Sequence, residues 1–96
     1  MLILQTLRNR VMHGFEIAEA IQRVSADVLR VEEGSLYPAL QRMLARRWVS
    51  GEWGKTEDNR RARYYTITAA GRKQLEREVE SYRRVSVAIG RILQPA

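Results

Sequence analysis

The sequence predicts a mainly α-helical domain with one small β-hairpin, and three observations support this fold class. Apolar residues recur at helical spacing from residue 2 to residue 44. Aromatic and β-branched residues then gather in two short segments on either side of a polar turn. A long amphipathic stretch follows and continues almost to the end of the chain.

The first part of the chain predicts two short helices, separated by a break at His13 and Gly14. The first ends near residues 8–10, and its apolar positions are Leu2, Ile3, Leu4 and Leu7. The second spans roughly residues 14–24, and its apolar positions are Phe15, Ile17, Ala18, Ile21 and Val24. Residues 25–27 end this helix, and a very short strand is expected from Val28, Leu29 and Val31.

A third helix is expected to begin around Gly34 and Ser35, with Ser35 as its N-cap. Pro38 would then lie in the first turn, where its missing N–H has no intrahelical partner to lose. The core positions of this helix are Leu36, Leu40, Met43 and Leu44. Its outward positions are Tyr37, Gln41, Arg42 and Arg46.

A hairpin is expected after this helix, with strands over residues 48–53 and 62–67 and a polar turn over residues 54–61. Its acidic residues are Glu57 and Asp58, and its basic residues are Lys55, Arg60, Arg61 and Arg63. The aromatic residues assigned to core or strand packing are Trp48, Trp53, Tyr64 and Tyr65. Strand alternation hides one of the last two, and the pattern leaves open which one.

Thr68 is expected to cap a last helix, in which Gly71 would be a mild weakness. Apolar positions of this helix step by three, four or seven residues, close to a heptad repeat: Leu75, Val79, Tyr82, Ile89 and Leu93. A domain this small does not need so long an amphipathic helix, so we expect it to mediate self-association. The expected organisation is one domain over 1–68, a dimerisation helix over 69–93 in the same compact unit, and a tail over 94–96.

Composition restricts the class of protein. The 96 residues suffice for one small domain, and a net charge of +6 favours an acidic partner, nucleic acid before an anionic membrane or an acidic protein. The absence of cysteine excludes disulfides and thiolate zinc sites and suggests a cytoplasmic location. No apolar run approaches the roughly 20 residues that a membrane-spanning helix needs, so no membrane partner is expected.

The sequence shows no arrangement of residues that would support catalysis or hold a cofactor or metal. His13 is the single histidine, and a turn or capping role suits it better than catalysis. Glu32 and Glu33 are adjacent and precede a helix start, where the helix macrodipole favours negative charge. Since glycine-rich phosphate loops and zinc-ligand clusters are also absent, we expect no enzyme, no cofactor and no metal.

The order helix, helix, helix, strand, strand, helix is that of a winged helix-turn-helix with an added C-terminal helix, so residues 1–68 are expected to form a winged-helix DNA-binding domain. The DNA-facing helix of such a domain presents its N-terminal residues to base edges. Ser35 and Tyr37 could donate to phosphates, Gln41 could pair with adenine and Arg42 with guanine. The expected DNA contacts are Ser35, Tyr37, Pro38, Gln41, Arg42, Arg46, Lys55, Arg60, Arg61 and Arg63. Two interpretations of Tyr37 stay open, a phosphate contact and a partly buried core ring.

Four motifs resemble the PadR family of bacterial transcriptional regulators: His13-Gly14-Phe15-Glu16-Ile17, Gly34-Ser35-Leu36-Tyr37-Pro38-Ala39-Leu40, Arg63-Tyr64-Tyr65 and Thr66-Ile67-Thr68-Ala69-Ala70-Gly71. The resemblance implies a winged-helix homodimer that binds operator DNA in a sequence-specific way and represses transcription. It also implies dimerisation of the C-terminal helix against the partner's N-terminal helix. Ser35, Tyr37 and Pro38 would lie on the DNA-facing end of the recognition helix and Arg63 on the side of the wing.

Some family members release DNA when they bind hydrophobic or aromatic small molecules, so such an effector, of unknown identity, is a third expected partner. The single C-terminal helix resembles the short branch of the family, and we expect the segment that usually precedes the first helix to be short or missing. An alternative from another class stays open. It is a dimeric interaction or architectural module that binds DNA without sequence specificity.

Overall fold

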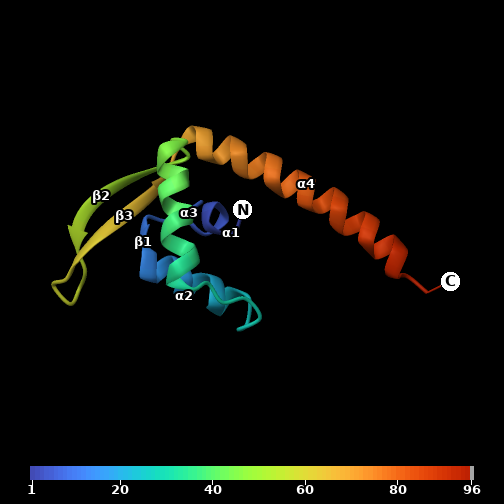
Figure 1. Ribbon diagram of the computed structural model, residues 1–96, viewed down its shortest axis with the longest axis horizontal. Coiled ribbons are helices and arrows are strands. Elements are labelled where there is room, and N and C mark those ends of the chain that lie inside the picture. Colours follow the sequence, from blue (N-terminus) through green and yellow to red (C-terminus); the bar gives the residue numbers. More distant parts are fainter. Residues whose placement is uncertain (96) are drawn as a thin grey trace.

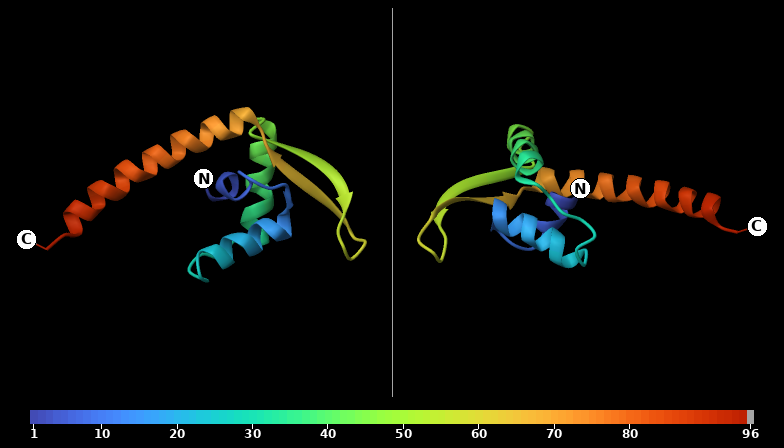
Figure 2. Two further views of the ribbon diagram at one scale, coloured as in Figure 1. Left: turned by 180° about the vertical axis from the view of Figure 1, so that it is seen from behind. Right: turned by 60° about the horizontal axis from the view of Figure 1, so that its bottom comes forward.

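The computed structural model describes residues 1–95 and contains a helical cluster and a small antiparallel sheet (Figure 1). In chain order the elements are α1 (Leu2–Thr6), β1 (Met12–His13), α2 (Gly14–Val24), α3 (Glu33–Ala45), β2 (Val49–Lys55), β3 (Arg61–Ile67) and α4 (Ala69–Leu93). The first three helices pack near the base of the sheet, whereas the β2–β3 hairpin and α4 extend from this cluster in opposite directions (Figures 1 and 2). The molecule is therefore elongated, with principal extents of 57 × 29 × 23 Å.

One hydrophobic core joins α1, α2, α3, the base of the sheet and the first turns of α4. Its most completely buried side chains are Leu4, Leu7, Ile17, Leu36 and Leu40. The expected range of the second helix is confirmed, but two of its expected core positions are wrong. Phe15 is 66% exposed and Val24 is also exposed, because the buried face of α2 runs through Ile17, Ala20 and Ile21 instead.

The sheet has the strand order β1-β3-β2, and all its pairings are antiparallel. Its edge strand β1 pairs Met12 with Tyr65 and His13 with Tyr64. The expected strand over residues 28–31 is wrong. Ser25 Oγ accepts the backbone N–H of Leu29 at 3.0 Å, which takes that N–H away from any strand ladder.

The third helix begins at Glu33, earlier than the expected start around Gly34 and Ser35. Glu32 is its N-cap residue and makes no side-chain capping hydrogen bond, so the expected capping role of Ser35 is wrong. Ser35 lies in the first turn, where its backbone N–H donates to the Glu32 carbonyl at 3.0 Å. Pro38 is consequently inside the helix rather than in its first turn. Because Pro38 has no N–H, the Gly34 carbonyl lacks its intrahelical hydrogen bond, but Gly34 is exposed and water can reach it.

The expected cap of the last helix is confirmed, because Thr68 Oγ1 accepts the N–H of Gly71 at 3.0 Å. The same hydroxyl donates to the Arg47 carbonyl at 2.6 Å, and the Thr68 N–H donates to the Trp48 carbonyl at 3.0 Å. The interpretation of Gly71 as a mild weakness is wrong. A Cβ at this position would collide with the Trp48 carbonyl oxygen and with the Ile67 side chain, so the junction requires glycine.

Only the first part of α4 packs against the rest of the described chain. Leu75 is buried in the core and Val79 is partly buried against it, whereas every residue from 80 to 93 is exposed. No helix within residues 1–95 is both long and apolar enough to cross a bilayer. Gln94 and Pro95 follow the helix, and the last residue of the expected tail lies outside the described residues.

Replacing Gly71 by alanine is expected to lower the free energy of unfolding by about 1–3 kcal/mol, because the added Cβ overpacks the contact with Trp48. Gly90→Ala is the matched control, since a Cβ on Gly90 meets no atom within 4 Å. The control is expected to be neutral or to stabilise the chain by up to about 1 kcal/mol through helix propensity. Urea denaturation measures both variants, and equal stabilities would contradict the close-approach argument.

Candidate nucleic-acid interface

A concave surface of about 640 Å³ lies between α3, the start of α2 and the hairpin, and we call it the α3–hairpin groove. It is lined by His13, Gly14, Phe15, Tyr37, Gln41, Trp53, Thr56, Asp58, Arg60, Arg61, Ala62, Arg63 and Tyr65. The groove thus joins part of the expected DNA-facing helix to three of the four basic hairpin residues. Phe15, Trp53 and Asp58 also line it, although the sequence did not assign them to the interface.

The face of the hairpin that carries Trp53 and Arg63 changes character along its length. The register places Val49 opposite Ile67, Gly51 opposite Tyr65, Trp53 opposite Arg63 and Lys55 opposite Arg61. Strand alternation puts all these side chains on one face of the sheet. At the base this face is buried in the core, whereas toward the tip it becomes aromatic and cationic.

Trp53 fits the strand-packing alternative of the sequence prediction and not the core alternative, because its side chain lies against arginines of β3 outside the core. The residue is 61% exposed, and two guanidinium groups lie over its indole ring. The Cζ atom of Arg61 is 4.5 Å and that of Arg63 is 5.9 Å from the ring centroid. Both distances are within the range of cation–π attraction. The indole therefore contacts two of the four basic residues of the hairpin, Arg61 and Arg63.

All five sequence-predicted contact residues of α3 are exposed, as is Arg46, the C-cap residue of this helix. Tyr37 and Gln41 line the groove, while Arg46 lies over the ring of Trp48 at 5.1 Å. Tyr37 is 45% exposed and its ring packs against Gly14 of α2, so the ring is partly buried, and the phosphate contact stays a prediction. A Cβ on Gly14 would lie 3.0 Å from the Tyr37 hydroxyl, so the glycine makes room for the ring.

The hairpin tip is closed by hydrogen bonds from Thr56, whose N–H donates to the Arg60 carbonyl at 2.8 Å and whose Oγ1 accepts the Arg60 N–H at 3.2 Å. Asn59 completes the turn with a φ of 62°, a left-handed conformation that asparagine tolerates. Lys55, Arg60 and Arg61 are exposed, and Arg63 is half-buried. Of the expected basic residues of the hairpin, Arg60 thus lies in this ordered turn, Lys55 ends β2, and Arg61 and Arg63 lie in β3.

Tyr65 is the hidden member of the tyrosine pair, which answers the question that strand alternation left open. Burial raises the pKa of Tyr65, the nearby Arg63 guanidinium partly opposes this, and Tyr37 adds to it. Tyr64 is half-buried on the other face, and its hydroxyl donates to the Lys55 carbonyl at 3.2 Å.

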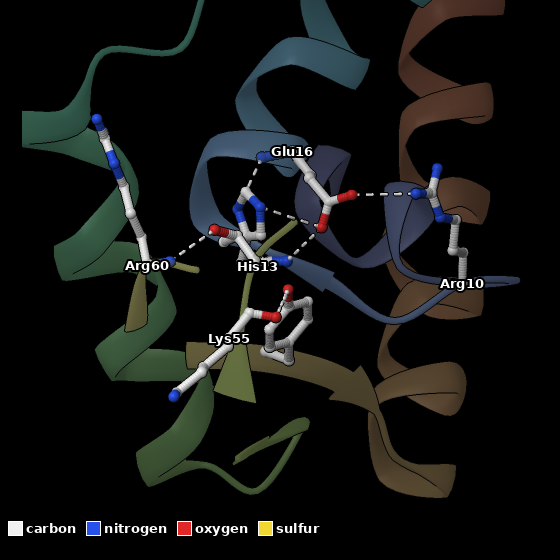
Figure 3. Close-up of polar contacts among 7 residues, drawn as sticks. Arg10, His13, Glu16, Lys55 and Arg60 are labelled. Carbon is white, nitrogen blue, oxygen red and sulfur yellow. Dashed lines mark hydrogen bonds and ion pairs between the residues drawn. The ribbon is translucent and has the colours of Figure 1, made fainter. Parts of the chain in front are cut away.

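The predicted capping role of His13 is confirmed by a reciprocal capping box at the start of α2 (Figure 3). His13 Nδ1 accepts the Glu16 N–H at 3.3 Å, and Glu16 Oε1 accepts the His13 N–H at 3.1 Å. Glu16 Oε2 also pairs with Arg10 Nη2 at 3.0 Å. Among residues 1–95, no group of three or more histidine, aspartate or glutamate residues could hold a metal ion.

The expected dimerisation residues divide into two sets. Leu75 is buried in the core of its own chain and Val79 is partly buried, whereas Tyr82, Ile89 and Leu93 are exposed. The sequence interpretation missed Val85 and Ile92, which are also exposed. Val85 lies three residues after Tyr82, and Ile92 lies three residues after Ile89. This helical spacing puts them on the same side of α4, and it is the signal that could have found them.

A family model and a curated relative match the chain. The model of the transcriptional regulator PadR-like family matches residues 3–77. Over all 96 residues the chain is 40% identical to a 37.1 kDa protein in transposon TN4556 of Streptomyces fradiae. The chain spans 25% of the length of that protein.

Solved structures with a winged-helix architecture confirm the predicted fold class. A PadR-like transcriptional regulator from Bacillus cereus has a TM-score of 0.81 and 29% identity, over 98% of this chain and 89% of that chain. The crystal structure of Bacillus subtilis PadR in complex with operator DNA has a TM-score of 0.72 over 81% of this chain and 44% of that chain. At 18% identity the second likeness shows a shared fold.

The raised pKa of Tyr65 predicts a loss of stability at alkaline pH. The folded chain keeps this proton at pH values where the unfolded chain has lost it, so the unfolded state gains as pH rises above about 10. The Tyr65→Phe variant keeps the ring and removes the ionisable group, so its free energy of unfolding should fall less between pH 9 and pH 11. Urea titrations at each pH measure this slope, and parallel curves for the two proteins would contradict the assignment.

Proposed function

Because the chain belongs to the PadR-like family of transcriptional regulators, we propose that it represses transcription in the cytoplasm by binding operator DNA as a homodimer. The family consists of regulators rather than enzymes. In the proposal, residues 1–68 hold the DNA and residues 69–93 join two protomers. Bacillus subtilis PadR, which shares this fold, was crystallised with operator DNA, and we extend that binding mode to this chain.

The α3–hairpin groove is the observation that carries the proposal. One side of it is the exposed surface of a helix that can enter a major groove, and the other side is a hairpin with three arginines. Gln41 and Arg42 are the two residues of α3 whose side chains suit bidentate contacts to adenine and guanine. Ser35 and Tyr37 would donate to phosphates, and Pro38 would lie against the backbone beside them.

The remaining basic residues would act on the DNA backbone. Arg46 follows Arg42 by one helical turn, and Lys55 and Arg60 lie near the hairpin tip. Each phosphate neutralised by such residues adds about −0.9 to the slope of log affinity against log salt concentration. A steep decrease in affinity with salt is therefore part of the proposal.

The exposed half of α4 supports the homodimer. Residues 80–93 extend over roughly 20 Å at 1.5 Å per residue, and Tyr82, Val85, Ile89 and Ile92 form an apolar stripe along them. This stripe continues the helix face that buries Leu75 in the core. A second copy of the chain would cover it, so we propose that α4 pairs the protomers.

Base recognition by α3 is tested by comparing Arg42→Ala with Arg60→Ala. Loss of the Arg42 contact should reduce discrimination at one base pair by about 1–3 kcal/mol. Loss of Arg60 should weaken binding to all duplexes equally and reduce the magnitude of the salt slope by about 1. Both effects are measured by fluorescence anisotropy with an operator first identified by footprinting of the purified protein, with single-base variants of this operator, and with a scrambled duplex.

If Arg42→Ala weakens all duplexes equally, as Arg60→Ala should, the loosely binding architectural module is the better hypothesis. A wild-type protein that binds operator and scrambled duplex with the same affinity would contradict the proposed specific regulator outright.

Dimerisation through α4 is tested by Ile89→Glu, which places a charge in the middle of the apolar stripe. We expect a monomer in sedimentation at tens of micromolar, together with weaker binding to an operator that has two half-sites. Val87→Glu is the matched control, because Val87 is exposed on a different side of α4. The proposed interface is wrong if wild type is a monomer under these conditions, or if both variants dissociate equally.

A further inference from the structure

We propose that Gly51 and Trp53 form a platform on β2 that positions the guanidinium groups of Arg61 and Arg63 for contact with DNA phosphates. This inference rests on the proposed DNA-binding function and assigns a role to two residues that the family comparison leaves unassigned. Trp53 and Gly51 are positioning residues in it, because the charged groups that meet the DNA belong to β3.

The first observation is the exposed indole. Trp53 lies in the outer half of the hairpin, away from the buried base of the sheet. Packing in the core therefore does not explain why this position has so large a side chain. Arg63 is its direct cross-strand partner, and Arg61 lies two residues further along the same face. The ring therefore extends from a position directly opposite Arg63 and diagonally opposite Arg61, and both guanidinium groups lie over it.

The second observation is the space above Gly51. A Cβ on this residue would lie 2.6 Å from Nε and 3.1 Å from Cζ of Arg63. The Arg63 side chain can thus lie flat across β2 only because residue 51 has no side chain. Its Nε is buried and has no hydrogen-bond partner among the described residues, so the contact with the strand rather than a polar partner holds the group.

The third observation is electrostatic. Within residues 1–95, neither Arg61 nor Arg63 forms an ion pair with a carboxylate, although Arg10 and Arg84 both do. Their charges are therefore not neutralised inside the described part of the chain. Both arginines line the groove that Tyr37 and Gln41 share, so they face the surface where the proposed function places the DNA.

These observations favour phosphate as the ligand. A planar guanidinium can stack on an indole with its face while its N–H edge binds a phosphate oxygen pair. An arginine that lies flat on the strand is held at the wall of the groove rather than extended toward base edges, and a DNA backbone bound in the groove as proposed would be within its reach. Ordering the side chain before binding also removes part of the entropy cost of association.

The binding test compares Trp53→Leu with Trp53→Phe on the full chain. Leucine removes the π-system, and phenylalanine retains a smaller one, so affinity should fall about three- to tenfold for the first and less than twofold for the second. The loss should be equal for the operator and for a scrambled duplex, because a phosphate contact is independent of sequence. Unchanged affinity of Trp53→Leu, or a loss confined to the operator, would overturn the inference.

A second test needs no DNA and so separates this inference from the proposed function. Trp48→Phe leaves Trp53 as the single indole of the chain. In that background, Arg61→Gln, Arg63→Gln and Gly51→Ala should each increase quenching of Trp53 fluorescence by acrylamide, because each uncovers the ring. Gly34→Ala is the control, since a Cβ there meets no atom within 4 Å. Thermal denaturation verifies folding of each variant, and quenching unchanged from the parent would overturn the platform.

If the wild-type chain binds no DNA while the quenching results hold, the platform exists and the proposed function is wrong. If the wild type prefers its operator while Trp53→Leu binds as well as wild type, the function stands and the platform is overturned.

Discussion

The junction between residues 47–48 and residues 68–71 is the constraint on which the arrangement of this molecule depends. Three hydrogen bonds meet there: Thr68 accepts from Gly71, and it donates to the carbonyl groups of Arg47 and Trp48. Gly71 lets the first turn of α4 approach the Trp48 carbonyl more closely than any side chain would allow. Because α3 ends and β2 begins on one side of this junction, and β3 ends and α4 begins on the other, it fixes the directions in which the hairpin and α4 leave the core.

In both the β2–β3 hairpin and α4, one face is buried in the core at one end and exposed at the other. The face of the hairpin that buries Val49 and Ile67 at its base presents Trp53 and Arg61 near its tip. The face of α4 that buries Leu75 continues as an exposed apolar stripe. The side-chain periodicity is the same along the whole of each element. What differs is whether the core covers that face or leaves it exposed. A surface that begins as an internal contact therefore ends as an external one.

This duality explains what the sequence could and could not predict. Thr68 and His13 were interpreted correctly because capping is a local interaction, decided within three residues. The expected cap at Ser35 is wrong because the helix can also begin earlier. The negative charge of Glu33 is favourable in the first turn, where it interacts with the helix macrodipole. The periodicity of Trp53 and Phe15 is that of core residues, and their exposure depends on where the core ends. The two-residue strand β1 and the requirement for Gly71 both depend on contacts between segments that are distant in the sequence. Such contacts leave no local sequence pattern.

The same junction has a consequence for how the two halves of the molecule act together. A hinge between α3 and α4 would let each protomer of a dimer place its groove freely, and the spacing of DNA half-sites would then be loosely defined. Here Thr68 binds the turn that follows α3 through the Arg47 carbonyl, and Leu75 anchors the next turns of α4 in the core that holds Leu36 and Leu40. Side chain and backbone thus tie the first two turns of α4 to the core that also holds α3. In a dimer paired through α4, this attachment would transmit the geometry of the pairing directly to the separation of the two grooves.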